Sequence, residues 1–314
     1  MKDSLGRTIN YLRVSVTDRC NLRCRYCMPE EGVEWLPHED ILSYEDILRL
    51  AAIFARLGGE KVRLTGGEPL ARKGLATLVA GLRAIDGIRE IAVTTNGALL
   101  EEQLPGLLAA GLTGVNISLD TLNEWTFRQI TRREGVRRTV KAIDTCLAAG
   151  LPVKVNCVPI APEEELVELA GLAKGRSLAV RFIELMPLGP GAQFPPEAFQ
   201  PCSAVLERLP ELRALRAPGG VARLYQLPGA VGRVGLISPV SHDFCARCDR
   251  VRLTSDGKLK PCLHSDKEIS LRGLTGRALR DALAAAIAAK PREHPPLTPG
   301  EATAGGRPMH RIGG

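Results

Sequence analysis

Six short strand-like runs, separated by longer segments with helical spacing, constrain the fold of this chain more than any other feature of its sequence. The runs cover residues 11–17, 61–65, 90–95, 114–120, 152–158 and 178–185. Apolar residues recur at helical intervals in 44–57, 74–85, 99–110, a stretch ending near 149, and 163–173. Ser43 is placed as a helix N-cap, and Gly58, Gly111 and Gly150 stand where helices usually end.

This alternation predicts an α/β fold with a parallel sheet and right-handed crossovers. Six strand–helix units are fewer than the eight of a closed barrel. The pattern is therefore compatible with a partial (β/α)6 barrel of TIM type and with a doubly wound sheet.

Polar and apolar residues alternate along the six runs, whereas a parallel sheet buried on both faces reads as nearly continuous apolar sequence. Neighbouring side chains on a strand point to opposite faces, so each strand has one apolar and one polar face. The polar positions are Arg13, Ser15, Arg63, Thr65, Thr94, Asn96, Asn116, Ser118, Asp120, Lys154, Asn156 and Arg181. We expect helices on the apolar face and polar faces that converge on a wet lumen. The alternative is an antiparallel sheet with one solvated face.

The composition is that of an ordinary globular protein, with 45% apolar and 25% charged residues among 314, which argues against a disordered or fibrous chain. The first residues lack the apolar core of a signal peptide, and no stretch approaches the roughly 20 apolar residues of a spanning helix. We therefore expect a cytoplasmic protein with no membrane partner. A net charge of +7 suits an anionic ligand or simply a mildly basic surface.

A shift towards Pro and Gly after Pro187 divides the chain. We predict a barrel in residues 1–187, a linker in 188–220 and a smaller C-terminal region in 221–314. That last region carries strand-like runs at 222–227 and 233–237, a hairpin at 250–260 that turns at Asp256-Gly257, and a helix at 279–289.

Three of the nine cysteines, Cys20, Cys24 and Cys27, form a C-x3-C-x2-C motif in the loop after the first strand. A disulfide framework is disfavoured in a reducing compartment, so metal chemistry is the better interpretation. Structural zinc normally takes four ligands, and His38 would be a candidate for the fourth. A four-iron cluster held by three cysteines instead leaves one iron without a protein ligand.

This motif, with Tyr26 just before its last cysteine, resembles the signature of the radical S-adenosylmethionine (radical SAM) superfamily. The segment from Thr65 to Pro69 is similar to the superfamily's GGEP segment, which lies along the methionine part of S-adenosylmethionine. The resemblance implies a partial (β/α)6 barrel and a [4Fe-4S] cluster on the three cysteines, whose open iron chelates S-adenosylmethionine. It also implies that the reduced cluster releases a 5′-deoxyadenosyl radical.

A second set of three cysteines, Cys245, Cys248 and Cys262, has the spacing C-x2-C-x13-C. On spacing alone a zinc site completed by His242 or His264 and a second iron–sulfur cluster are equally good interpretations. Arg250 and Arg252 stand beside the thiols, and a structural zinc site does not need such cations.

Phe244-Cys245, the stretch 253–259 and the terminal Gly313-Gly314 extend the resemblance, which then covers residues 5–314 and is specific to the GTP 3′,8-cyclases of molybdenum cofactor biosynthesis. Asp249 departs from that family, which usually has Asn there. The resemblance implies a lyase that converts GTP to 3′,8-cyclo-7,8-dihydro-GTP, and a tail that reaches the active site. It also implies a second [4Fe-4S] cluster whose open iron binds guanine.

The same resemblance implies a role for individual residues. The metal ligands are Cys20, Cys24, Cys27, Cys245, Cys248 and Cys262. The GTP site is formed by Arg13, Arg63, Thr94, Lys154, Arg250 and Arg252, of which Arg13 and Arg252 are expected to be catalytic. The S-adenosylmethionine site is formed by Tyr26, Gly67, Ser118 and Met186. The implied partners are GTP, a cellular reductant and the downstream cyclic pyranopterin monophosphate synthase, and a homodimer remains open.

Two alternatives stay open beside this interpretation. One is a radical SAM peptide-modifying enzyme with an auxiliary cluster, although such proteins often carry more C-terminal cysteines. The other is a zinc-bearing nucleic-acid-binding protein, which is disfavoured because the cations lie within strands and aromatic residues make up only 4%. We expect no nucleic-acid partner. Cys146 and Cys157 are expected in the core, and Cys202 at a linker or helix start with no role.

Overall fold

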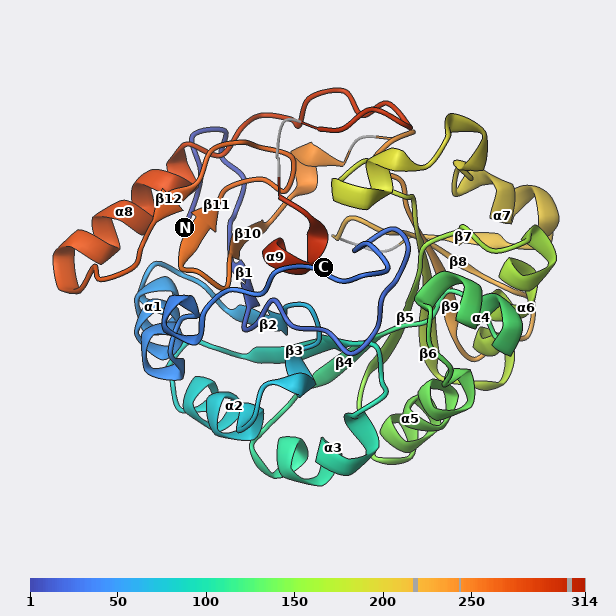
Figure 1. The fold of residues 1–314 in the computed structure, drawn as a ribbon, viewed down its shortest axis with the longest axis horizontal. Coiled ribbons are helices and arrows are strands. Elements are labelled where there is room, and N and C mark those ends of the chain that lie inside the picture. Colours follow the sequence, from blue (N-terminus) through green and yellow to red (C-terminus); the bar gives the residue numbers. More distant parts are fainter. Residues whose placement is uncertain (217–219, 243, 304–306, 314) are drawn as a thin grey trace.

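One curved sheet organises the protein, with most helices on its outer side (Figure 1). The structure is a computed structural model that describes residues 1–216, 220–242, 244–303 and 307–313. Within them the sheet has twelve strands in the order β12-β11-β10-β1-β2-β3-β4-β5-β6-β9-β8-β7. The six parallel strands β1 to β6 follow sequence order, without the reversal that a doubly wound sheet requires, so the doubly wound alternative is wrong. The order ends at β12 and β7 without closing, so the curved sheet is a partial barrel.

All six predicted strands are present and pair in parallel with their neighbours in sequence order. They are β1 (Tyr11–Ser15), β2 (Lys61–Thr65), β3 (Glu90–Thr95), β4 (Gly114–Ser118), β5 (Val153–Cys157) and β6 (Leu178–Ile183). The helices between them are α1 (Tyr44–Arg56), α2 (Leu75–Arg83), α3 (Leu100–Ala109), α4 (Glu124–Thr131), α5 (Val136–Ala148) and α6 (Glu163–Gly175). The predicted α/β fold of partial (β/α)6 type is confirmed.

The chain between β4 and β5 contains two helices where the sequence suggested one pattern ending near residue 149. Asn123 caps α4 by accepting from the backbone of Trp125 and Thr126. Arg132 then adopts a left-handed backbone with φ of 55°, and Gly135 follows with φ of 140°. Two such residues end one helix and start another, because neither backbone fits a continuous helix. Ser43 caps α1 as predicted.

The C-terminal region extends the same sheet. β9 (Arg233–Ile237) pairs in parallel with β6, and β10 (Arg250–Leu253) pairs in parallel with β1. Antiparallel strands complete both edges: β8 (Arg223–Gln226) and β7 (Arg213–Leu215) beside β9, and β11 (Lys258–Lys260) and β12 (Ile269–Ser270) beside β10. The remaining helices are α7 (Ser203–Arg208), α8 (Gly276–Ala288) and α9 (Met309–Ile312). The segment 188–220, expected as a linker, therefore contains α7 and β7 in its described part.

Helices cover the apolar side of the strands, and the core lies between them. Val14, Leu64 and Val155 are fully buried strand residues of this layer, and Phe54 of α1 is fully buried against it. Cys146 and Cys157 belong to the same core, as predicted. Among the described residues, no helix is both long and apolar enough to cross a membrane.

Candidate active site

The polar faces of the six central strands surround a cavity of about 420 Å³ on the concave side of the sheet. Arg13, Arg63, Thr94, Asn116, Ser118, Asp120, Lys154, Asn156 and Arg181 line it. These are nine of the twelve alternating polar positions of the sequence, so the predicted polar lumen is present. Ser15, Thr65 and Asn96 are not among the residues that line it. The solvated-face alternative is wrong.

Cations dominate this cavity. Arg250 and Arg252 of β10 join the strand cations, and Arg252 stands beside Arg13 in the parallel register. Burial and the neighbouring charge of Arg250 lower the pKa of Arg252 to about 10. Burial and the charge of Arg181 lower the pKa of Lys154 to about 8. Bringing these charges together is costly without an anion, so the cavity is suited to a polyanionic ligand.

Tyr11 stands between two of these cations. The guanidinium groups of Arg63 and Arg250 both lie 5.6 Å from the centre of its ring, and Arg63 also donates a hydrogen bond to its hydroxyl. The Nε of Arg181 is buried and has no hydrogen-bond partner among the described residues. Unpartnered buried guanidinium donors of this kind match the oxygen atoms of phosphate groups.

The first cysteine motif lies in a loop that is fastened to the rest of the barrel. Cys27 and Met28 donate backbone hydrogen bonds of 2.8 and 3.0 Å to the carbonyl oxygen of Cys24, which curls the loop back on itself. Burial and the nearby Cys27 raise the pKa of Cys24 well above its usual value, and burial and the nearby Cys20 raise the pKa of Cys27 to about 12. The three cysteines thus share one curled loop of eight residues, as ligands of one cluster require.

The segment after β2 lies directly against this loop. Gly67 and Glu68 donate backbone hydrogen bonds to Thr17 and Arg19, at 2.8 and 2.7 Å. A β-carbon on Gly67 would lie 2.4 Å from the carbonyl oxygen of Arg19, so only glycine fits. The buried carboxylate of Glu68 accepts hydrogen bonds from Leu70 and from the end of β3, and burial raises its pKa to about 7.

Tyr26 connects the first cysteine loop to the cavity. It lines the cavity, and its hydroxyl donates a 2.8 Å hydrogen bond to Asp120 at the end of β4. Burial raises the pKa of Asp120 to about 6, despite the hydrogen bonds from Val158 and Tyr26. Ser118 and Met186 line the same cavity.

The second cysteine triplet lines the cavity itself, together with Lys290, His264 and His294. Burial tends to raise the pKa of Cys248, but the charges of Lys290 and Arg250 outweigh burial and lower it. Lys290 also donates to the carbonyl oxygens of Arg250 and Pro261, which holds the strand hairpin in place. A thiol whose pKa is lowered by cations is readily available as a thiolate ligand.

The two triplets lie at opposite ends of two neighbouring strands. Cys248 precedes β10, and Cys20 follows β1, which runs parallel to β10. A strand rises about 3.3 Å per residue, so the length of β1 separates the two ends by about 17 Å. The cavity therefore extends between the two cysteine regions.

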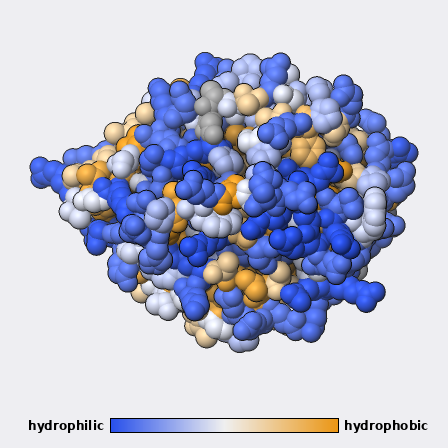
Figure 2. All heavy atoms as spheres, viewed as in Figure 1, coloured by the Kyte–Doolittle hydropathy of each residue, from blue (hydrophilic) through white to orange (hydrophobic). Residues whose placement is uncertain are grey.

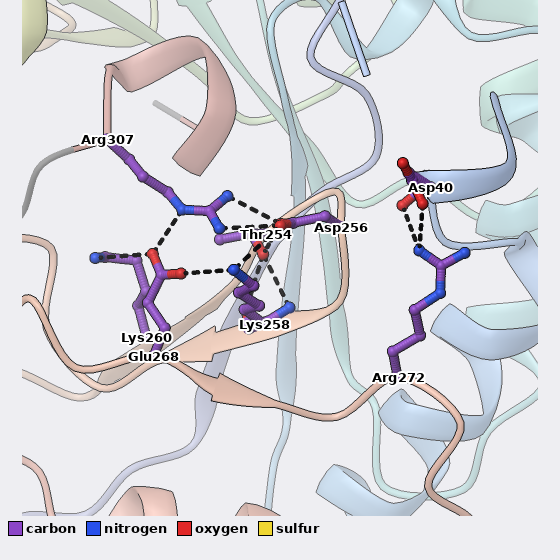
Figure 3. A network of polar contacts seen from close by, with 8 residues as sticks. All are labelled: Asp40, Thr254, Asp256, Lys258, Lys260, Glu268, Arg272 and Arg307. Atoms are coloured by element: carbon purple, nitrogen blue, oxygen red, sulfur yellow. Dashed lines mark hydrogen bonds and ion pairs between the residues drawn. The ribbon is translucent and has the colours of Figure 1, made fainter. Parts of the chain in front are cut away.

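The C-terminal tail closes over the same region. Arg307 forms a bidentate ion pair with Asp256, with distances of 3.0 and 2.9 Å, and its Nε lies 2.7 Å from Glu268 (Figure 3). Beyond this anchor, Arg252 donates a hydrogen bond to the carbonyl oxygen of Gly313, so the tail does reach the cavity wall. Gly314 lies outside the described residues.

Three thiols at each triplet fit an iron–sulfur cluster by their chemistry, because thiolates are the usual ligands of such clusters. Among the described residues, no group of three His, Cys, Asp or Glu side chains is placed to hold a single metal ion. In a cubane each cysteine binds a different iron, so its ligands need not converge on one point.

The structure brings most of the predicted site residues to one cavity. Those that line it are Arg13, Arg63, Thr94, Lys154, Arg250, Arg252, Tyr26, Ser118, Met186, Cys245, Cys248 and Cys262. Gly67, Cys20, Cys24 and Cys27 lie in the adjoining loops and are not among the lining residues. Cys202 precedes α7 and is fully buried, in agreement with the expected helix start.

Several lining residues were not assigned a role from the sequence. Arg181 and Tyr11 both line the cavity. The strand alternation predicted the direction of Arg181, and it missed Tyr11, although Tyr11 is two residues before Arg13 and shares its face. Lys290, His264 and His294 come from irregular segments, where no periodicity indicates which way a side chain points.

Comparisons with known proteins agree with this site. Residues 14–173 match the radical SAM superfamily, and residues 178–296 match the family described as Molybdenum Cofactor Synthesis C. The chain is 46% identical to the GTP 3′,8-cyclase of Peptoclostridium acidaminophilum over 320 residues, covering 99% of this chain and 98% of the relative. It is 47% identical to that of Moorella thermoacetica over 307 residues, covering 94% and 95%. The chain belongs to the GTP 3′,8-cyclase family of radical SAM enzymes.

The fold comparison gives the same superfamily architecture. SuiB of Streptococcus suis, solved with S-adenosylmethionine bound, superimposes with a TM-score of 0.61 at 15% identity, over 90% of this chain and 68% of SuiB. At this identity the likeness concerns the fold alone. Radical SAM enzymes use S-adenosylmethionine and an iron–sulfur cluster, and the first cysteine triplet lies within the matched residues 14–173.

Proposed function

We propose that this chain is the lyase that converts GTP to 3′,8-cyclo-7,8-dihydro-GTP, the first step of molybdenum cofactor biosynthesis. The observation that carries the proposal is a cavity lined by eight Lys and Arg side chains and by the second cysteine triplet, with Tyr26 of the first cysteine loop also in its wall. The full-length relatives named GTP 3′,8-cyclase support the same activity.

The proposal includes two [4Fe-4S] clusters, each with three cysteine ligands. Cys20, Cys24 and Cys27 would hold the first, and Cys245, Cys248 and Cys262 the second. With S-adenosylmethionine bound, the first cluster would supply a 5′-deoxyadenosyl radical for abstraction of the 3′ hydrogen of GTP. Tyr26, Gly67, Ser118 and Met186 would surround S-adenosylmethionine.

The chain's own side chains bind and orient the nucleotide. Arg13 on β1, Arg63 on β2 and Lys154 on β5 line the cavity, so they can neutralise a triphosphate along its length. Thr94 lies between them and already accepts from Arg63 at 3.4 Å. Arg250 and Arg252 stand next to the second triplet, where the base would bind. With the triphosphate and the base both bound, the ribose between them keeps its 3′ carbon in position for hydrogen abstraction.

Arg13 and Arg252 are the pair we propose to be catalytic, because they stand side by side in register in the middle of the cavity wall. The Gly313 carbonyl accepts from Arg252, so the tail sets the direction of that guanidinium. Both arginines would shield the reacting nucleotide from water together with the tail.

The wider context belongs to the same proposal. The product passes to the downstream cyclic pyranopterin monophosphate synthase, a cellular reductant supplies electrons, and the enzyme works in the cytoplasm, as a monomer or a homodimer. We also propose the division into a barrel at 1–187, a connecting segment at 188–220 and a cluster-binding region at 221–314, although β9 and β10 of the last region share the barrel's sheet.

An anaerobic assay with GTP, S-adenosylmethionine and a reductant tests the activity, with mass spectrometry to detect an isomer of GTP. Replacing Cys24 by Ala should abolish 5′-deoxyadenosine formation. Replacing Arg252 by Ala should weaken GTP turnover while S-adenosylmethionine cleavage is partly retained. Equal loss of both reactions in the Arg252 variant would contradict its assignment to the GTP site.

A further inference from the structure

A strongly basic surface lies on the outside of the barrel, on helices α4 and α5. The segment from Asn123 to Lys141 carries six cations and only two carboxylates. We call its exposed aromatic and cationic residues the α4–α5 surface, which consists of Trp125, Arg128, Arg133, Arg137, Arg138 and Lys141. The exposed carboxylates of the same segment are Glu124 and Glu134. Figure 2 shows hydrophilic side chains over the position that α4 and α5 occupy in Figure 1.

Three of the five cations on this surface are free to meet a partner. Arg128 lies 3.3 Å from Glu134, and Lys141 lies 2.7 Å from Glu101. Arg133, Arg137 and Arg138 are exposed, and no described carboxylate lies within salt-bridge distance of them. Exposed ion pairs contribute little to stability, so folding alone gives no reason to gather these charges.

An aromatic residue and a groove lie within the basic surface. Trp125 is 71% exposed, more than the other exposed large hydrophobic residues of the described chain, Leu5 at 50% and Val231 at 62%. A groove of about 740 Å³ lies along α5 and is lined by the apolar residues Leu122, Val136 and Val140 and by the charged residues Arg137, Lys141 and Asp144. Exposed Trp and Arg residues around an apolar patch are typical of protein–protein interfaces.

This surface is bonded directly to the loop of the first cysteine triplet. The backbone amides of Arg23 and Arg25 donate to Thr131 and Ile130 at the end of α4, at 3.0 and 2.9 Å. The guanidinium of Arg132 donates to the carbonyl oxygens of Arg23 and Met28, at 2.9 and 3.1 Å. The residues on either side of Cys24 and Cys27 are therefore held by the same short segment that presents the basic surface.

We propose that the α4–α5 surface is the docking site of an acidic protein that carries single electrons to the cluster of the first cysteine triplet. The inference rests on the proposed function, because that chemistry requires the cluster to be reduced from outside the chain. In the transfer, a carrier with a flavin cofactor goes from hydroquinone to semiquinone and loses one electron, which reduces the cluster from the 2+ to the 1+ state. Acidic side chains of the carrier would meet Arg133, Arg137 and Arg138, and Trp125 would be buried at the centre of the contact.

A nucleic acid would also be attracted by these charges, but the surface presents one exposed aromatic residue rather than a series of stacking platforms. Nucleic-acid binding would also not explain why this segment is hydrogen-bonded to the loop of the first cysteine triplet. An acidic redox protein accounts for both the charge and the position.

The test uses the enzyme with both clusters loaded and a purified acidic flavodoxin as the probe. Its dissociation constant is measured by anaerobic calorimetry for the wild type, for Arg137→Glu with Arg138→Glu, and for Trp125→Ala. The matched control is Arg277→Glu with Arg280→Glu, which makes the same charge change on exposed residues of α8. This helix lies at the left of Figure 1, opposite α4 and α5. We expect the dissociation constant to rise at least tenfold in both α4–α5 variants and less than twofold in the control. Wild-type binding should weaken steeply with added salt.

Product formation is then driven in parallel by reduced flavodoxin and by dithionite. We expect the Arg137→Glu, Arg138→Glu variant to be slow with flavodoxin and normal with dithionite. Unchanged binding in both α4–α5 variants, an equal loss in the α8 control, or tighter capture of a DNA oligonucleotide than of flavodoxin would each overturn the docking site. Absence of product from the wild type with dithionite would instead refute the proposed function, and the dissociation constants would still decide the docking site.

Discussion

Replacing Gly313 by Ala tests whether the tail acts in the cavity, because the structure leaves no room for a β-carbon there. Gly313 has φ of 85°, in the region that favours glycine. Its β-carbon would lie 2.2 Å from the hydroxyl oxygen of Thr65 and 3.2 Å from the β-carbon of Ser15. Thr65 cannot easily yield, because it is buried and its hydroxyl donates to the carbonyl oxygen of Val14 at 3.1 Å.

In Gly313→Ala, the free-energy cost of keeping the last residue in the cavity exceeds the stabilisation that its hydrogen bond from Arg252 provides. The backbone strain is about 1–3 kcal/mol, and overpacking against Thr65 adds about 1–3 kcal/mol. The hydrogen bond from Arg252 to Gly313 offsets only about 1.5–3 kcal/mol, as expected for a charged donor. The Gly313 end of the tail should therefore leave the cavity wall. The helix α9 before it should stay, because His310 and Ile312 are buried and Arg311 donates a hydrogen bond to the carbonyl oxygen of Glu34 at 3.0 Å. The anchor at Arg307 (Figure 3) and the barrel itself should be unaffected.

We expect kcat/KM for GTP to fall at least tenfold in Gly313→Ala, with a melting temperature within about 2 °C of the wild type because the barrel is intact. Gly229→Ala is the matched control. Gly229 also has positive φ, 70°, but its β-carbon would meet no atom within 4 Å and it lies in the turn between β8 and β9. Strain of about 1–2 kcal/mol must there be absorbed by the folded sheet, so this control should melt earlier and keep its activity. Full activity of Gly313→Ala would refute the reasoning.

Two further predictions concern the cysteines and the phosphate site. Replacing Cys262 by Ala should lower the iron content from about eight to about four per chain. The control Cys146→Ala, in the buried core on α5, should keep all the iron and only lower the melting temperature. Equal iron loss in both variants would contradict the second cluster site. The affinity for GTP should fall as pH rises through about 8, because Lys154, whose pKa burial and Arg181 lower to about 8, is then deprotonated. Calorimetry at pH 7 and pH 9 checks this dependence, which Lys154→Arg should remove and which a constant wild-type affinity would contradict.

The sequence was sufficient to predict the barrel wall because side-chain direction in a strand follows a fixed period of two. Arg13 between Leu12 and Val14 in the chain must face away from both, and the structure places it in the cavity while both neighbours are buried in the core. The cysteine spacing predicted three neighbouring thiols for a similar local reason, since eight residues of loop cannot carry them far apart.

Contacts between distant segments could not be predicted in this way. The pairing of β10 with β1 joins residues almost 240 positions apart, and no local pattern determines which edge of the sheet a late strand joins. The break between α4 and α5 depends on a left-handed backbone at Arg132, a conformation that arginine rarely adopts. Lys290 and His294 reach the cavity from the end of α8 and the segment after it, where sequence carries no directional signal.

The backbone pairing of β10 with β1 determines the distance between the two cysteine triplets, so substitutions of cavity side chains do not change that distance. Arg252 and Arg13 are neighbours because β10 and β1 pair in register, and that register also fixes how far Cys248 lies from Cys20. Substituting a cavity side chain changes the affinity for a ligand but leaves this distance intact. Slipping β10 by one residue would instead turn Arg252 out of the cavity and bring Val251 in, because neighbouring residues face opposite sides. A slip of this strand pair would therefore change both the charge of the cavity wall and the spacing of the triplets, whereas a side-chain substitution changes the charge alone.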